Sequence, residues 1–333
     1  MVSCKKSEPV SELEEPVTPV ELDIAVAEIK HHVDVKREPD PQYSFLGFGY
    51  DVTDTYQHAA SVRAKVFDAR KFVEMNPGRF NDMKNSSGYS FTAAGTTCRE
   101  LSTLLSSGIY ETDGFAAFKS TLSSAFPDQT YASGKYAYVY HSLIVSYGSL
   151  RLNGSLGSES SSFSSTLTDS FILDISQLSA AELVQKYGTH VVFEATRGIR
   201  LDMVYQTAPA HGDRESILKE GLRYALGKVF GFHSGYLDPT NQKNLAANKS
   251  PRIAYELVGG DVTKLKIDTS SSTTKIDLTE WLGSTSREAA VFTGVTPSGL
   301  FPLYELINDA SKKAEVKAYI LKHILENQVE IEE

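Results

Sequence analysis

The hydrophobic positions of this chain predict a polar N-terminal stretch followed by a region rich in strands. The clearest strand covers residues 135–152, where apolar side chains occupy both faces, a pattern typical of a strand in the interior of a sheet. Residues 45–53, 61–73, 199–207 and 253–261 also have extended character, and residues 233–251 are predicted to be a loop. The Gly-x-Gly of Gly47 and Gly49 is interpreted as close backbone packing, because no third glycine or helix start follows it.

Helices are predicted at two places. Ser179 is a suitable N-cap, and Glu182 stands three residues later in the capping-box position, which predicts a helix that ends near residue 187. The C-terminal residues 301–328 are predicted to contain one or two helices. Their apolar faces would be supplied by Val316, Ala318, Tyr319, Leu321, Ile324 and Leu325.

Residues 98–126 fit two secondary structures. The side chains of Phe115, Phe118, Leu122 and Phe126 recur three or four positions apart, as on one face of a helix. The last three also share parity, so they would lie on one face of a strand, with Ser120 and Ser124 between them. The pattern therefore predicts either a narrow amphipathic helix or a weakly alternating strand.

Residues 213–232 carry the same ambiguity more strongly. At helical spacing they form an apolar stripe. At strand spacing the even positions form a bulky face, which consists of Leu218, Leu222, Tyr224, Leu226, Phe230 and Phe232 and is interrupted by Lys228. Each glycine at 221, 227 and 231 costs a helix about 1 kcal/mol relative to alanine. The segment is either a surface helix or a segment that can change its secondary structure.

The N-terminal residues 1–42 are predicted to be a largely disordered tether, because Glu, Pro and Val recur there without a stable period. Within them, the stretch MVSC ends at Cys4 and is followed by polar residues, as at the start of a lipidated bacterial surface protein. The alternative is an ordinary exposed cysteine. Cys98 is predicted to be a buried, unpaired thiol. Residues 43–333 are predicted to form one domain.

Composition and charge exclude several classes of protein. The chain has 333 residues, of which 41% are hydrophobic, and a net charge of −9, so a basic surface for nucleic acid is not expected. Adhesion to anionic lipid by charge alone is not expected either. His190 and Glu194 do not form a zinc-protease motif, and no nucleophile elbow, phosphate loop or Cys/His grid is present in the sequence. We therefore expect neither an enzyme nor a cofactor or metal.

The stretch YGTHVVFEATRGIR at residues 187–200 resembles the signature of the membrane attack complex/perforin (MACPF) superfamily. Tyr187, Gly188, Thr189, His190 and Gly198 match that pattern at its spacing, whereas Val191 replaces an aromatic residue and Ile199 a second glycine. The resemblance extends from about residue 43 to residue 328. LGFGYDVT near its start, VGGD at 258–261, Trp281 and the closing helices are similar to Bacteroidetes-type members.

This resemblance implies an α+β fold of the MACPF/cholesterol-dependent cytolysin-like type. Its centre would be a bent, twisted, mainly antiparallel four-stranded sheet, flanked by two helical clusters at residues 96–134 and 209–252. Each cluster would unfurl into an amphipathic β-hairpin that crosses a membrane as part of a closed barrel. The residues expected to insert are Phe115, Phe118, Leu122, Phe126, Leu222, Tyr224, Leu226, Phe230 and Phe232. Gly188, Gly198, Gly259 and Gly260 would lie at bends or hinges of the sheet, or else in ordinary turns.

The function implied is that of a pore-forming toxin directed against competing bacteria. Such a protein would bind a lipid or a surface receptor of the target, associate with copies of itself into a ring or arc, and insert its hairpins. It would reside on a bacterial surface as an outer-membrane lipoprotein, or be secreted. The alternative is a non-lytic surface adhesion or interaction protein that keeps the fold. Ser120, Ser124 and Lys228 favour this alternative, because each interrupts a prospective lipid-facing surface.

Overall fold

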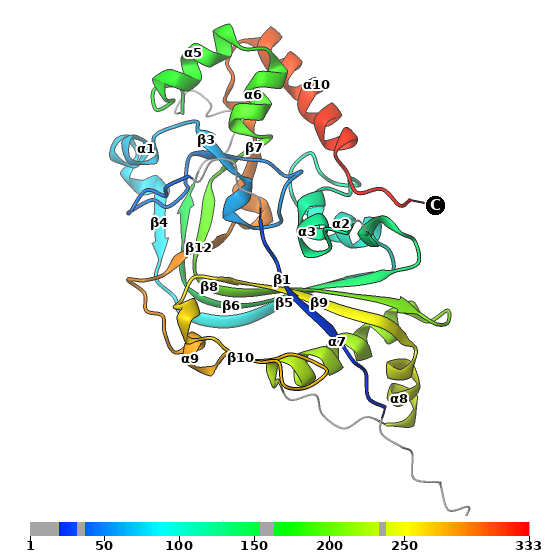
Figure 1. Ribbon diagram of the computed structural model, residues 1–333. Helices are drawn as coiled ribbons and strands as arrows, with labels where there is room; N and C mark the ends of the chain where they lie inside the picture. The colour runs from blue at the N-terminus through cyan, green and yellow to red at the C-terminus, as the bar shows by residue number, and fades with distance from the viewer. Residues whose placement is uncertain (1–19, 32–36, 129, 154–162, 233–237, 333) are drawn as a thin grey trace, which may run out of the picture.

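The computed structural model describes residues 20–31, 37–128, 130–153, 163–232 and 238–332 (Figure 1). Its centre is a bent sheet of four long antiparallel strands flanked by helices, which confirms the predicted α+β architecture. In spatial order these strands are β5 (Ser87–Gly95), β6 (Ala137–Leu152), β8 (Glu194–Pro209) and β9 (Asn248–Val258). Within the described residues three short strands complete the sheet, namely β1 (Ala25–Glu28), β4 (Phe80–Met83) and β12 (Val291–Gly294).

The two inner strands, β6 and β8, form the longest ladder of the sheet. They pair from Ala137 opposite Thr207 to Arg151 opposite Glu194. β5 and then β4 pair with successive parts of β6, and β9 and then β12 pair with successive parts of β8. The sheet bends between these two parts, so that β6 and β8 run along both arms (Figure 1). The apolar character of β6 on both faces follows from its central place, as predicted.

Helices cover opposite faces of the long arm of the sheet (Figure 1). The first cluster, α2 (Cys98–Ser106) and α3 (Lys119–Ala125), connects β5 to β6. The second cluster, α7 (Arg214–Phe230) and α8 (Pro239–Ala246), connects β8 to β9. Along β8, Val204 belongs to the apolar core on the first side, and Met203 and Tyr205 belong to the core on the second side. The clusters thus lie between consecutive strands, as expected.

A second sheet of four short strands lies beside the short arm, in the order β13 (Leu300–Pro302), β7 (His190–Val192), β2 (Phe48–Tyr50) and β3 (Val62–Lys65). Around it are α1 (Ala69–Met75), α5 (Asp169–Gln177), α6 (Ala180–Tyr187) and α10 (Ala310–Glu326). α6 begins with the predicted capping box of Ser179 and Glu182. Of the residues assigned to the faces of the C-terminal helix, Val316 and Ile324 are buried but Leu325 is 52% exposed.

The remaining elements are short. A hairpin of β10 (Lys266–Asp268) and β11 (Lys275–Asp277) precedes α9 (Thr279–Leu282), which buries Trp281. The 3₁₀ turns are η1 (Ala59–Ser61), η2 (Pro77–Arg79), η3 (Thr130–Ala132), η4 (Val262–Lys264), η5 (Pro297–Gly299) and η6 (Leu303–Leu306).

The structure corrects three expectations. Residues 61–73 are extended only as far as Lys65, because Asp68 accepts hydrogen bonds from two backbone N–H groups and starts α1. α8 lies in a stretch that was expected to be a loop, after the N-cap Asp238 and with Pro239 at its first position. Residues 25–28 belong to the sheet as β1 and not to a tether. Cys4 and residues 1–19 lie outside the described residues, whereas Cys98 is buried and unpaired, as predicted.

Candidate functional site: the helical clusters and the bend of the sheet

Glycines allow the close strand packing at the bend of the central sheet. Gly198 of β8 lies opposite Ser146 of β6, next to a bulge between Ser146 and Gly148. A Cβ atom on Gly198 would lie 2.0 Å from the carbonyl oxygen of Val145, and one on Gly148 would lie 2.0 Å from that of Met83. Neither position has room for a side chain, so the bend depends on glycine in both inner strands.

Gly259 and Gly260 directly follow β9 and lie close to Gly198. Both have left-handed backbone conformations, with φ of +74° and +66°. They end β9 beside Trp281, whose indole Nε1 donates a hydrogen bond of 3.0 Å to the carbonyl oxygen of Gly259. Gly198, Gly259 and Gly260 therefore lie at the bend, where the sequence analysis placed them, and their action as hinges stays a prediction. Gly148 was missed, although a glycine inside a long strand is itself a signal of a bulge.

Gly188 lies elsewhere, which corrects its assignment to the bend of the central sheet. It ends α6 with φ of +75° and packs against the backbone of Tyr50 in the second sheet. Next to it, the Thr189 hydroxyl accepts a hydrogen bond of 3.1 Å from the backbone N–H of Val52. The Tyr187 hydroxyl donates to the Asp174 carboxylate at 2.6 Å. The Tyr-Gly-Thr part of the motif thus fixes the second sheet to α5 and α6.

His190 links the second sheet to the first helical cluster. Its Nε2–H donates a hydrogen bond of 2.7 Å to the carbonyl oxygen of Tyr110, which lies between α2 and α3. Its Nδ1 lies 2.9 Å from the Thr189 hydroxyl, which supplies the proton of that bond. Complete burial lowers the pKa of His190 to about 4, so the ring is neutral at pH 7. Glu194 is bound separately by Thr296 and Arg151.

A buried ion pair lies in β8, two residues beyond Gly198. The guanidinium of Arg200 is 2.7 Å from the carboxylate of Asp202, and Tyr140 of β6 donates to the other carboxylate oxygen at 2.7 Å. Arg200 also donates to the carbonyl oxygens of Gln57 and Thr293. Burial alone would lower the pKa of Arg200, but Asp202 raises it above its usual value. The sequence analysis missed this pair, although two charges inside an apolar strand were a visible signal.

The apolar residues of the first cluster are part of the main core. Phe118, Leu122 and Phe126 are at most 1% exposed, and Phe115 packs against them from a partly buried position. The ring of Phe118 meets that of Tyr56 edge-on, with centroids 5.1 Å apart. These side chains therefore face the protein interior.

The predicted inserting residues of the second cluster lie on α7 and just beyond it. Leu222 and Phe230 are 8% and 5% exposed, while Tyr224, Leu226 and Phe232 pack at the margin of the core on this side. The ammonium of Lys228 lies at the surface, 3.4 Å from the carboxylate of Glu21. In the described part of the chain, no helix combines the length and the apolar character needed to cross a bilayer.

Asn248, the first residue of β9, holds the second cluster against the sheet. Its amide nitrogen donates to the carbonyl oxygens of Ile217 in α7 and of Asn244 and Leu245 in α8, at 3.0 to 3.2 Å. Its amide oxygen accepts a hydrogen bond of 2.9 Å from the Tyr205 hydroxyl of β8. Gly221 makes this approach possible, because a Cβ atom there would lie 2.2 Å from that amide oxygen. One side chain thus joins two helices and two strands.

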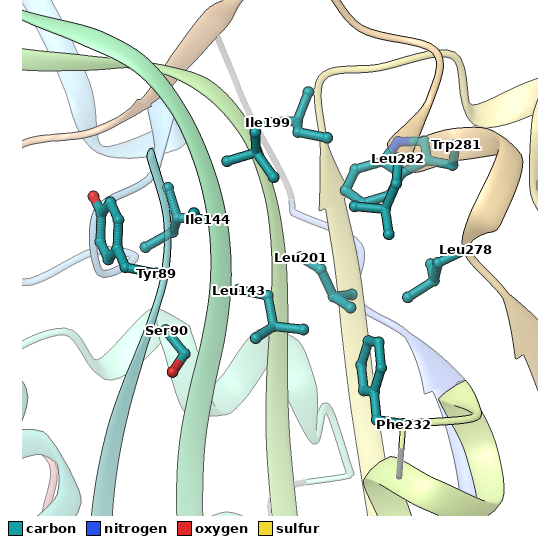
Figure 2. Close-up of a pocket in the computed structure, with 12 residues that line it drawn as sticks. Tyr89, Ser90, Leu143, Ile144, Ile199, Leu201, Phe232, Leu278, Trp281 and Leu282 are labelled. Atoms are coloured by element: carbon teal, nitrogen blue, oxygen red, sulfur yellow. The ribbon is translucent and has the colours of Figure 1, made fainter. Parts of the chain in front are cut away.

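An apolar cavity of about 360 Å³ lies between the second cluster and the bend (Figure 2). Leu143, Ile199 and Leu201 line it from the inner strands, Phe232 lines it from the end of α7, and Trp281 closes it from α9. The pocket opens to solvent, since Tyr89 and Leu282 in its lining are 47% and 44% exposed. It thus leaves apolar side chains of the sheet without packing partners next to the bend glycines.

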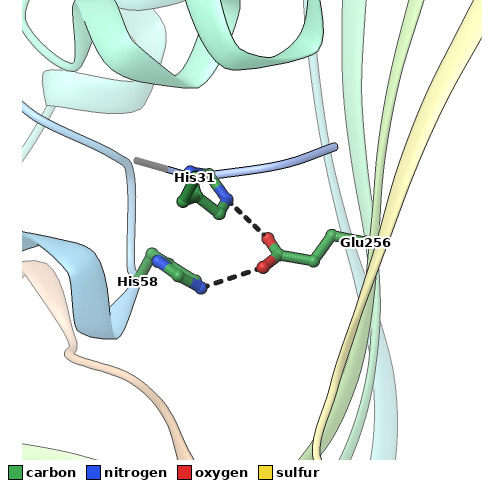
Figure 3. Close-up of side chains that lie close together, drawn as sticks. All are labelled: His31, His58 and Glu256. Atoms are coloured by element: carbon green, nitrogen blue, oxygen red, sulfur yellow. Dashed lines mark hydrogen bonds and ion pairs between the residues drawn. The ribbon is translucent and has the colours of Figure 1, made fainter. Parts of the chain in front are cut away.

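His31, His58 and Glu256 form a compact cluster at the edge of the sheet (Figure 3). The two Nε2 atoms lie 2.8 and 3.0 Å from the two oxygens of Glu256. The His58 Nδ1 accepts a hydrogen bond of 3.0 Å from the backbone N–H of Ala60, which places the proton of that ring on Nε2. A metal would need this Nε2 lone pair, so the hydrogen bonds favour a carboxylate clamp over a metal centre. Although burial alone would raise it, the two rings lower the pKa of Glu256 to about 2.

Two solved structures resemble the chain over most of its length. A protein with a MAC/Perforin domain from Bacteroides thetaiotaomicron VPI-5482 has a TM-score of 0.67 and 18% identity, and the match covers 89% of this chain and 64% of that one. GNIP1Aa from Chromobacterium piscinae has a TM-score of 0.66 and 16% identity, with 86% and 57% covered. This chain therefore spans less than two thirds of the length of either protein. No protein-family model and no curated protein sequence matches it.

Proposed function

We propose that this chain, which has the fold of the MACPF domain, is a pore-forming protein that converts its two helical clusters into membrane-spanning β-hairpins. The observation that carries the proposal is the position of the clusters. The first joins β5 to β6 and the second joins β8 to β9, and the two strands of each pair are already adjacent and antiparallel. Helices that became strands would extend each pair as a hairpin in the existing register.

The length of the two connections supports this conversion. A strand that crosses a bilayer needs about 10 residues, so a hairpin needs roughly 20. The connections cover residues 96–136 and 210–247, and each is longer than that. Closure into a barrel would require several copies side by side, because an open sheet edge is not tolerated in hydrocarbon. Assembly into a ring or arc is therefore part of the proposal.

The target we propose is the membrane of a competing bacterium. The resemblance to a Bacteroides protein supports a role on a bacterial surface or in the secreted fraction. A net charge of −9 disfavours attraction to anionic lipid by charge alone, so a lipid or receptor of the target would be recognised by specific contacts. The action would consist of binding, assembly and insertion, with no covalent step and no cofactor.

Dye release from vesicles tests this function. A disulfide between Gly221→Cys and Asn248→Cys would tie α7 to β9, because a Cβ atom at 221 lies 2.8 Å from the Cγ atom of Asn248, near the place that a sulfur would take. The variant also carries Tyr205→Phe, because the Tyr205 hydroxyl would lie 2.3 Å from that Cβ atom. On vesicles of phosphatidylethanolamine and phosphatidylglycerol, or on intact target cells, we expect release by the reduced protein and at least tenfold less by the oxidised protein.

The reduced form of the same variant is the matched control, because it has lost the Asn248 hydrogen bonds but carries no lock. Equal release by both forms would refute hairpin formation by the second cluster. If the unmodified chain released no dye from any of these membranes, pore formation itself would be wrong and a non-lytic surface protein would be the better interpretation.

A further inference from the structure

Residues 328–332, here called the latch, follow α10 and lie against the first helical cluster (Figure 1). Val329 is completely buried in the main core and Gln328 is 8% exposed, whereas the other three side chains of the latch are exposed. The latch is therefore fixed to the cluster by one buried apolar side chain and by hydrogen bonds.

One part of the latch binds the start of α2. The Cys98 thiol donates to the carbonyl oxygen of Glu330 at 3.8 Å. The guanidinium of Arg99 donates to the side-chain oxygen of Gln328 at 3.4 Å. Cys98 and Arg99 are the first two residues of α2, so these contacts lie close to Gly95, where β5 ends.

Another part of the latch binds residues that follow α3 and precede β6. The backbone N–H of Glu332 donates a hydrogen bond of 2.8 Å to the carbonyl oxygen of Ala132, and Glu332 forms a parallel bridge with Ser133. Between the two parts, the backbone N–H of Val329 donates to the carbonyl oxygen of Ala116 at 2.7 Å. The latch thus contacts the start, the middle and the end of the connection from β5 to β6.

The ladder of β5 and β6 indicates what these contacts prevent. Gly95 lies opposite Tyr138, and each further step raises the first number and lowers the second by one. Continued in this register, the proposed hairpin would bring Glu100 opposite Ser133. The latch binds Ser133 itself and the neighbour of Glu100. It therefore occupies both of the segments that would pair at the base of the new hairpin.

We propose that the latch holds the first cluster in its helical state and has to leave before β5 and β6 can extend into a hairpin. The proposal rests on the proposed function, because it assigns a step in the conversion of this cluster. Burial supports it. The latch buries one apolar side chain, that of Val329, whereas the cluster buries Phe118, Leu122 and Phe126. The latch can therefore come free at a smaller cost than the cluster itself.

A disulfide between the latch and the cluster tests the proposal in the full chain. Ser133 and Glu332 are bridge partners, so the variant Ser133→Cys with Glu332→Cys can be oxidised to fix the latch. On vesicles of phosphatidylethanolamine and phosphatidylglycerol, we expect the oxidised protein to release dye at least tenfold less than the reduced protein.

A disulfide outside the latch controls for oxidation itself. Lys266→Cys with Asp277→Cys links register partners of the β10–β11 hairpin, and its oxidation should leave dye release unchanged. Both double variants also carry Cys4→Ser, so the remaining native thiol is that of Cys98. Burial of Cys98 raises the pKa of its thiol, so it competes little as a thiolate.

Hydrogen exchange in the unassembled protein tests the latch without any pore. Val329→Ala weakens the apolar anchor of the latch, so the amides of α2 and α3 should exchange at least tenfold faster, while those of the β6–β8 ladder stay unchanged. Val316→Ala is the matched control, because it makes the same substitution at a completely buried position of α10 outside the latch. It should leave exchange in α2 and α3 unchanged relative to the ladder.

The two measurements separate failure of the latch from failure of the pore. Equal release of dye by the oxidised and the reduced latch variant would overturn the latch proposal and leave pore formation intact. Exchange in α2 and α3 that is no faster in Val329→Ala than in Val316→Ala would also overturn it. If no form released dye but exchange changed as expected, the latch would stand and the proposed function would fail.

Discussion

The two helical clusters occupy equivalent positions in the topology but are held in different ways. The first cluster buries its aromatic residues in the larger core, which continues through the second sheet to α10. The second cluster covers a smaller core and lies beside a cavity of about 360 Å³. It is joined to its surroundings by the hydrogen bonds of Asn248 and by contacts with residues 20–31. Packing in the larger core holds the first cluster, whereas the second cluster combines packing in a smaller core with specific polar contacts.

This difference indicates which cluster would move at lower cost. Removal of Phe118, Leu122 and Phe126 from the sheet would open the main core, since all three side chains are almost completely buried. Release of α7 would break a few hydrogen bonds and expose Ile217, Leu218 and Val229, which are at most 1% exposed, but the core that it opens is the smaller of the two. We therefore expect the second cluster to leave the sheet first.

The largest expected effect is that of truncating an aromatic residue in the first cluster. Phe126→Ala should lower the free energy of unfolding by about 3–5 kcal/mol, because a side chain that is 1% exposed would leave a cavity between α3 and β6. Leu226→Ala in α7 is the counterpart. It should cost roughly 1–2 kcal/mol, because that side chain is only partly buried.

Urea unfolding followed by circular dichroism measures both values. Equal losses for the two variants would contradict the comparison, since the clusters would then be held equally by packing. A larger loss of stability for Leu226→Ala than for Phe126→Ala would reverse the comparison and would make the first cluster the more mobile one.

Acid should loosen the first cluster through His190. The pKa of this ring is about 4 in the folded protein, below its usual value near 6.5, because the ring is buried. Between these two values the unfolded chain binds the proton and the folded chain does not, so stability falls as the pH is lowered from about 6.5 to about 4. The loss attributable to His190 is on the order of 3 kcal/mol. Burial also lowers the pKa of His141.

The local measurement is hydrogen exchange in residues 107–118, which carry the carbonyl group of Tyr110 that His190 binds. Exchange there should accelerate between pH 6.5 and pH 4, after correction for the intrinsic rate. His190→Gln should flatten the dependence of stability on pH, whereas His211→Gln, at an exposed position, should leave it unchanged. The same slope in His190→Gln and in the unmodified chain would contradict this prediction.

The sequence predicted those parts of the molecule whose local pattern of apolar and polar residues matches their place in the fold. The strand at 135–152 is apolar on both faces because it lies inside the sheet, and the capping box at Ser179 acts through neighbouring residues. The order of the strands and the two clusters followed from a resemblance to known proteins. The bend glycines were located because the same resemblance marked Gly198.

Other parts could not be predicted because their roles arise between distant segments. β5 has few apolar side chains, since it forms an exposed edge of the sheet, and β1 has no period of its own because β9 supplies its pairing. The clamp joins residues from three separate segments, His31, His58 and Glu256, so no spacing along the chain reveals it. The structure shows residues 214–230 as a helix, which fits both readings of residues 213–232, so conversion of this segment stays a prediction.

The smallest expected change in stability, at Lys228 of the second cluster, gives the sharpest test of insertion. The ion pair of Lys228 with the largely exposed Glu21 contributes little, so Lys228→Leu should alter the free energy of unfolding by no more than about 0.5 kcal/mol. In a membrane-inserted strand, Lys228 would share the lipid face with Leu226 and Phe230, at a cost of about 2–4 kcal/mol near the bilayer centre.

Lys228→Leu should therefore lower the protein concentration needed for half-maximal dye release by at least about tenfold, which corresponds to 1.4 kcal/mol. Lys219→Leu is the matched control, because it makes the same substitution at an exposed position of α7 that precedes residues 222–232 and has the opposite parity. Glu21→Gln removes the same ion pair without changing the lipid face. If Lys219→Leu increased release as much as Lys228→Leu, a general gain in hydrophobic character would explain the result and residues 222–232 would not insert as an alternating strand.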